Sequence, residues 1–193
     1  MEAFENRPVA APRRPRSLVL LHWITLVPLG LAFAAVLLRG QVEERALRAG
    51  LLWVHQCSGA TVLVLGVLRL IGRWRIGPLP ATAGPRWASG AAAALHGGLY
   101  LAMLVVPLLG WGFTTASGHL PPWGMGLPGL TEDEDLADRI GAWHTRGGYA
   151  WLLVIGLHVA AALWHHFVLR DGMLNAMRLQ RSAGISPDRT PPA

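Results

Sequence analysis

Four long apolar stretches, separated by short polar segments, constrain the fold of this chain more than any other feature. They run over residues 18–38, 51–71, 91–113 and 147–169. Each has the roughly 20 residues that a helix needs to cross the hydrocarbon core of a bilayer. Only 15% of the residues are charged, whereas soluble domains average about 25%. The sequence therefore predicts an all-α membrane protein, a four-helix transmembrane bundle surrounded by lipid.

The segments around these stretches leave little room for a separate soluble domain. We expect one transmembrane domain over residues 17–170, a disordered cytoplasmic N-terminus over residues 1–16 and a cytoplasmic tail over residues 171–193. The first stretch exceeds the roughly 7–15 apolar residues of a signal-peptide core, and no small-x-small cleavage motif follows it before Arg39. We therefore interpret it as a helix that is retained.

The basic residues predict how the bundle is oriented. All 17 are arginines, and in a soluble protein a net charge of +6 would suggest nucleic acid as a partner. Here they gather before the first stretch, between the second and third, and after the fourth: Arg7, Arg13, Arg14, Arg16, Arg73, Arg75, Arg86, Arg170, Arg178 and Arg181. By the positive-inside rule, both termini and the middle loop face the cytoplasm. We expect no nucleic-acid partner.

Several histidines lie inside the predicted membrane spans, where an imidazole is energetically unfavourable. Among the eight, His22, His55, His96, His158 and His165 lie inside the apolar stretches. A polar ring within a membrane is expensive unless it is paired or functional. Cys57 is the only cysteine, so the chain has neither an internal disulfide nor the C-x-x-C-H motif that attaches haem covalently. Any haem must be held by coordination and packing.

The spacing of two histidines indicates what the rings bind. His144 and His158 lie 14 residues apart, about 21 Å along a helix and only about 40° from the same face. Two stacked haems require this spacing, and matching depths pair His55 with His144 and His22 with His158. Zinc would gather its ligands at one depth, usually with cysteine or carboxylate. The sequence thus predicts two b haems with bis-histidine iron, although histidines that serve only packing or metal transport stay an alternative.

The contexts of these histidines resemble those of the prokaryotic cytochrome b561 family, which is related to the cytochrome b subunits of nickel hydrogenases. The matching segments are residues 21–23, 54–59, 143–144 and 156–166. The resemblance covers roughly residues 16–171. It implies that the haem ligands of the family fall on His22, His55, His144 and His158, and that the chain spans a bacterial inner membrane.

The resemblance also implies electron transfer. Some members of the family look like superoxide oxidases that pass electrons to ubiquinone, and others look like conduits for a partner dehydrogenase. Residues 121–127 resemble the outer loop of the superoxide-oxidising type. The acidic residues 132–135, in contrast, disfavour the approach of an anion. We expect a di-haem cytochrome that carries electrons between an outer-face donor and the quinone pool. Three alternatives remain for the function. The chain could oxidise superoxide, carry electrons for a partner dehydrogenase or other redox protein, or be a bundle without haem.

Two arginines lie near the predicted ligands. Arg69, near the cytoplasmic end of the second stretch, is a candidate to pair with a haem propionate or to orient a quinone. Arg146 is a candidate for the same role at the outer haem. The alternative for Arg69 is a charge that snorkels to the membrane surface and sets topology, and for Arg146 a solvated side chain.

The remaining histidines have less specific interpretations. His96 is a candidate for packing or for part of a quinone pocket. His165 and His166 could form a proton path to a reduced quinone, or they could anchor the helix at the interface. His119 could line a substrate entrance in the outer loop, although a solvated loop residue is the simpler interpretation.

Overall fold

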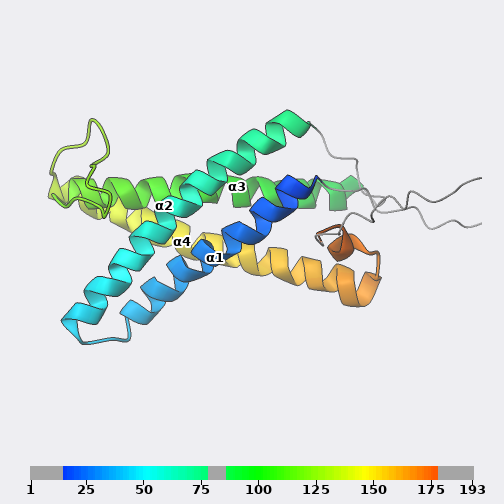
Figure 1. Cartoon of the computed structure of the whole chain (residues 1–193), viewed down its shortest axis with the longest axis horizontal. Coiled ribbons are helices and arrows are strands. Elements are labelled where there is room, and N and C mark those ends of the chain that lie inside the picture. The colour runs from blue at the N-terminus through cyan, green and yellow to red at the C-terminus, as the bar shows by residue number, and fades with distance from the viewer. Residues whose placement is uncertain (1–14, 78–85, 178–193) are drawn as a thin grey trace, which may run out of the picture.

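Four long helices make up most of the part of the chain that the computed structural model describes, residues 15–77 and 86–177 (Figure 1). They are α1 (Arg16–Arg39), α2 (Arg45–Ile76), α3 (Arg86–Ala116) and α4 (Glu134–Trp164). A π-helical turn (His165–Leu169) and a short 3-10 helix (Met173–Met177) follow. The predicted N-terminal segment up to residue 14, most of the predicted tail, and Arg7, Arg13, Arg14, Arg178 and Arg181 lie outside the described residues.

All four helices have the length and composition of membrane spans. Their most apolar windows have mean hydropathies of 2.1, 1.7, 1.9 and 1.9 in chain order. At most 22% of the residues in any of these windows are buried inside the protein. An apolar surface this extensive suits lipid and not water. The predicted four-helix transmembrane bundle is therefore confirmed.

The helices form two antiparallel hairpins that cross (Figure 1). The first pairs α1 with α2, the second pairs α3 with α4, and α2 also packs against α3. Both connections, residues 40–44 and 117–133, lie at one end of the bundle, which we name the loop end. The start of α1 and the end of α4 lie at the opposite end, which we name the terminal end.

A small core lies between the hairpins. Val62, Met103, Val106 and Trp151 are buried against one another. The ring of Phe33 packs edge-on against Trp151, with 5.7 Å between centroids. Because Trp151 is seven residues from both His144 and His158, this core lies about midway between the two histidine levels of α4.

The fourth helix begins at Glu134, earlier than the predicted start at Gly147. Its first turn is capped by Asp133, whose carboxylate accepts a hydrogen bond of 2.9 Å from the backbone N–H of Leu136. Acidic residues in that turn also favour the positive end of the helix dipole. The helix was predicted from the length of its apolar stretch, so the prediction did not include these polar turns. His144 consequently lies within a continuous helix.

Candidate functional site

The two histidines of the predicted outer pair face each other near the loop end. His55 comes from α2 and His144 from α4. Their ring centroids are 5.9 Å apart and their planes cross at 81°. Two imidazole nitrogens that each lie about 2 Å from one metal ion would place the ring centroids about 6 Å apart. The spacing therefore suits one metal ion between the rings.

Backbone carbonyls of the other two helices hold these rings. His55 Nδ1 lies 2.8 Å from the carbonyl oxygen of Ala32 on α1, and His144 Nδ1 lies 2.9 Å from that of Val106 on α3. A carbonyl can only accept, so in both rings Nδ1–H donates and Nε2 keeps its lone pair. Histidines that ligate metals are usually held in this way. Each of the four helices thus contributes one group to the site.

Glycines leave room beside both rings. Gly59 and Gly148 each follow a histidine of the pair by four residues, and a Cβ at either position would meet no atom within 4 Å. Gly110 has the opposite role, because a Cβ there would lie 2.9 Å from Cε1 of His144. Small residues therefore open space along α2 and α4 while allowing His144 to approach α3.

A cavity of about 150 Å³ lies between the helices at this level. The residues that line it include His55, His144, Gly59, Gly148, Phe33 and Trp151. Ligand pockets commonly enclose about 300–1,000 Å³, so a group as large as haem would extend past this volume between the helices. The two imidazoles, the glycines and the apolar walls fit a flat metal-bearing ring.

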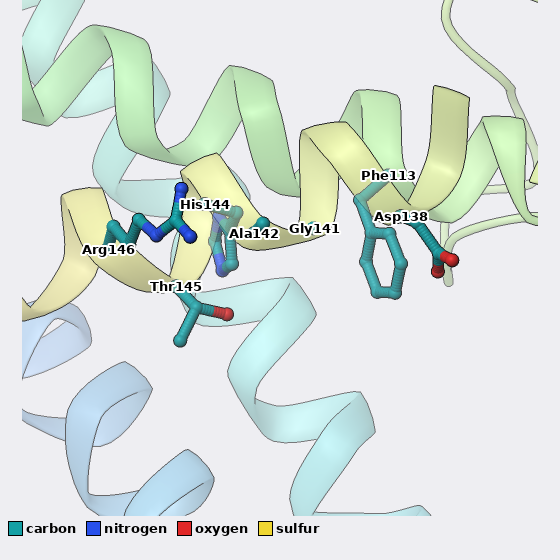
Figure 2. Close-up of a pocket in the computed structure, with 7 residues that line it drawn as sticks. All are labelled: Phe113, Asp138, Gly141, Ala142, His144, Thr145 and Arg146. Atoms are coloured by element: carbon teal, nitrogen blue, oxygen red, sulfur yellow. The ribbon is translucent and has the colours of Figure 1, made fainter. Parts of the chain in front are cut away.

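A second hollow of about 420 Å³ adjoins the first on the side of the loop end (Figure 2). It is lined by Phe113, Asp138, Gly141, Ala142, His144, Thr145 and Arg146. His144 and Thr145 line both hollows. In Figure 2 the Arg146 side chain extends along α4 toward His144, while Phe113 and Asp138 lie together farther toward the helix start.

The terminal end holds three histidines instead of two. His158 on α4 lies 6.3 Å from His22 on α1 and 5.4 Å from His96 on α3, measured between ring centroids. The predicted pair His22 and His158 is therefore brought together, but His96 is also present. Depth could have revealed this, because His22 and His96 lie six and ten residues from the starts of helices that begin at the same end.

The predicted cofactor-binding residue Arg69 lies beside this group. Its Nη2 is 3.2 Å from Nδ1 of His22, and its guanidinium is 5.5 Å from the ring centroid of Tyr100. A guanidinium has no acceptor, so Nδ1 of His22 accepts here. His96 instead donates from Nδ1 to the carbonyl of Ala92 on its own helix, over 2.6 Å. The side chain of His96 is exposed whereas that of His22 is half-buried.

The other predicted histidines lie apart from both pairs. His165, in the π-helical turn, has its Nδ1 2.5 Å from a carboxylate oxygen of Asp171. The His166 ring packs edge-on against Phe167, with 4.7 Å between centroids. His119 is exposed in the connection between α3 and α4. Within residues 15–77 and 86–177, no three His, Cys, Asp or Glu side chains are grouped so as to hold a bare metal ion.

Comparison with known proteins gives consistent matches along the chain. A sequence profile of the family described as prokaryotic cytochrome b561 matches residues 13–178. "Cytochrome b561 homolog 1" of Escherichia coli K12 is 31% identical over 88% of this chain and 98% of its own length. "Probable superoxide oxidase CybB" of Yersinia pestis is 30% identical over 81% of this chain and 90% of its own. "Cytochrome b562" of Cereibacter sphaeroides is 30% identical over 88% of this chain and 98% of its own.

Proposed function

The chain belongs to the prokaryotic cytochrome b561 family of b-type haem proteins, and we propose that it is a di-haem cytochrome. It carries electrons across a bacterial membrane between a donor at the loop end and a quinone at the terminal end. One haem binds between His55 and His144, and the other between His22 and His158. Membership of the family shows that the chain is a membrane cytochrome. The number of haems, their ligands and the quinone are part of this proposal.

The observation that carries the proposal is the construction of the outer pair. Two imidazoles from α2 and α4 face each other at 5.9 Å, and both donate Nδ1–H to carbonyls of neighbouring helices. Packing alone would not require two imidazoles held in this way to line one cavity together with glycines. Bis-histidine coordination of one iron explains the spacing, the tautomers and the glycines together.

At the inner site the proposed residues that would hold the iron are His22 and His158. His22 would bind after its Nδ1 contact with Arg69 gives way, because a ring whose Nδ1 accepts carries its proton on Nε2. Arg69 is close enough to His22 to pair with a propionate of a haem bound there, or to orient a quinone carbonyl. We assign His96 to the rim of this site, because its side chain is exposed whereas that of His22 is half-buried. A rim position also suits a role in a quinone pocket.

Haem, when bound, supplies the one-electron chemistry, and the chain supplies ligation, orientation and burial. The histidines would hold the iron. The carbonyls that accept from Nδ1–H of His55 and His144 would adjust how strongly these two imidazoles donate to it. The apolar walls exclude water, which would otherwise weaken these interactions.

The proposed orientation places the loop end outside the cell. The terminal end carries Arg16, Arg73, Arg75 and Arg170, whereas the outer loop and the first turns of α4 carry acidic residues between positions 132 and 138. The positive-inside rule assigns the arginine-rich side to the cytoplasm. A quinone at that end could take protons through His165, which Asp171 orients.

Two donors are candidates. The relative named as a probable superoxide oxidase supports superoxide, two of which would give up one electron each to reduce one quinone with two protons, releasing two molecules of oxygen. The acidic loop instead favours a redox protein or a partner dehydrogenase as donor, because like charges repel superoxide.

Nanodiscs with a short-chain ubiquinone test the proposed function. Superoxide generated enzymatically should reduce the b-type spectrum within seconds and form ubiquinol, and superoxide dismutase should abolish both effects. A cytochrome that superoxide leaves oxidised, but that a partner dehydrogenase reduces, would assign the conduit role. Failure of any donor or quinol to change the spectrum would contradict electron transfer to quinone.

A further inference from the structure

The hollow in Figure 2 is not accounted for by the axial ligands. Its volume of about 420 Å³ falls in the range of ligand sites. It meets the ring cavity at His144 and Thr145. A group held on His144 that is longer than the ring cavity therefore has this hollow beside it to extend into.

Arg146 provides the only cationic side chain, apart from the histidine, among the residues that line this hollow. Its guanidinium lies 5.9 Å from the ring centroid of Trp143. No carboxylate among the described residues forms an ion pair with it. Asp138 lines the same hollow, but it lies eight residues earlier on α4, about 12 Å along the axis. The guanidinium is therefore available to an external anion.

Haem has an apolar ring and two propionate carboxylates at one edge. A carboxylate near the membrane needs a charged or hydrogen-bonding partner, and a guanidinium can bind it with two parallel N–H donors. The ring cavity is mainly apolar, the adjoining hollow adds Arg146, and Thr145 lines both. We propose that Arg146, with Thr145, forms a carboxylate-binding subsite that holds a propionate of the outer haem.

The inner site has a similar arrangement. Arg69 lies over the Tyr100 ring beside His22, as Arg146 lies over the Trp143 ring near His144. Each proposed haem would thus have one guanidinium that an aromatic ring holds in place. The inference rests on the proposed function, because it requires a haem between His55 and His144.

The same subsite could instead hold a small anionic donor, so the test separates the two sources of negative charge. Full-length protein produced without haem would be titrated in nanodiscs with haem and with haem dimethyl ester, whose propionates carry no charge. The variants are Arg146→Gln, Arg146→Lys and the control Arg139→Gln. Arg139 is an exposed arginine of the same helix, and its Nε donates to the backbone of Asp135.

In the wild type and in Arg139→Gln, esterification should weaken binding at the outer site about tenfold, which matches the loss of one charged hydrogen-bonded contact. Arg146→Gln should bind haem about tenfold more weakly and should no longer distinguish haem from its ester. Arg146→Lys should retain part of the difference, because it keeps the charge without the paired donors.

Equal haem binding and an equal ester penalty in Arg146→Gln and Arg139→Gln would overturn the inference. Unchanged haem binding with slower reduction by superoxide in Arg146→Gln alone would also overturn it, and would assign the subsite to a small anionic substrate. A wild-type chain without an outer haem would instead refute the proposed function, so the two failures are distinguishable.

Discussion

At the loop end, the rings of His55 and His144 are held by backbone carbonyls of Ala32 and Val106, whereas at the terminal end His22 is held by the side chain of Arg69. A carbonyl remains when its residue is substituted, but a guanidinium can be removed by one mutation. The outer site should therefore be rigid and sensitive mainly to shape. The inner site should be adjustable through charge.

The two ends also differ in the number of imidazoles. Two rings face each other at the loop end, and glycines open the space around them. Three imidazole rings lie together at the terminal end, with those of His22 and His96 each in contact with that of His158. The inner site thus contains one imidazole more than a bis-histidine haem requires, and the assignment of His22 over His96 is the part of the comparison most open to a direct test.

The largest expected effect comes from His158. His158→Ala should remove the inner haem and leave the outer haem, so the content falls from two haems to one per chain. His22→Ala should do the same, while His96→Ala should keep both, because His96 lies at the rim. A pyridine haemochrome count on each purified variant measures this. Two haems in His22→Ala, with one in His96→Ala, would reassign the inner ligand.

The next largest effect should come from shape at the outer site. Gly110→Ala would place a Cβ 2.9 Å from the His144 ring, and overpacking of this kind costs about 1–3 kcal/mol. We expect the affinity for the outer haem to fall about 5- to 150-fold, with binding of the inner haem unchanged. The matched control is Gly90→Ala on the same helix, where a Cβ would meet nothing within 4 Å. Equal haem loss in both variants would show that His144 does not depend on this approach.

Charge at the inner site should have a smaller effect. Arg69→Gln removes a cation that lies beside His22, and a nearby cation favours the reduced haem because it carries one positive charge less. Redox titration should give a lower inner potential, by about 59 mV if the reduction equilibrium changes tenfold, with the outer potential unchanged. Arg75→Gln, an exposed arginine of the same helix, is the control. A shift in the potential of the outer haem alone would show that Arg69 does not act on the inner haem.

The smallest effect should come from the core between the sites. Trp151→Phe keeps an aromatic ring against Phe33, so we expect a loss of about 1 kcal/mol and full retention of both haems. Because Trp151 and Phe33 also line the cavity beside His55 and His144, any faster thermal release of haem should appear first in the outer haem. Faster release of the inner haem alone would mean that this core supports the inner site instead.

Much of the fold could be predicted because apolar length and histidine spacing are local properties of the sequence. The four spans and the face shared by His144 and His158 follow from helix geometry. The start of α4 was predicted too late, because its first turns depend on the cap at Asp133 and not on hydropathy. The apolar criterion could not detect a cap.

The details of the sites were less accessible. The carbonyls that hold His55 and His144 belong to Ala32 and Val106, whose side chains give no sign of this role. The need for glycine at position 110 arises only where α3 approaches the His144 ring. Such features depend on how two hairpins cross, which pairs residues far apart in the chain.

The central claim is that the chain holds two haems at two separate histidine pairs. The most direct test is a pyridine haemochrome count per chain on purified wild-type protein that was expressed with ample haem, together with its reduced-minus-oxidised spectrum. We predict two b-type haems with low-spin bands. One haem per chain would contradict the two-site account, and none would leave the histidines with structural roles alone.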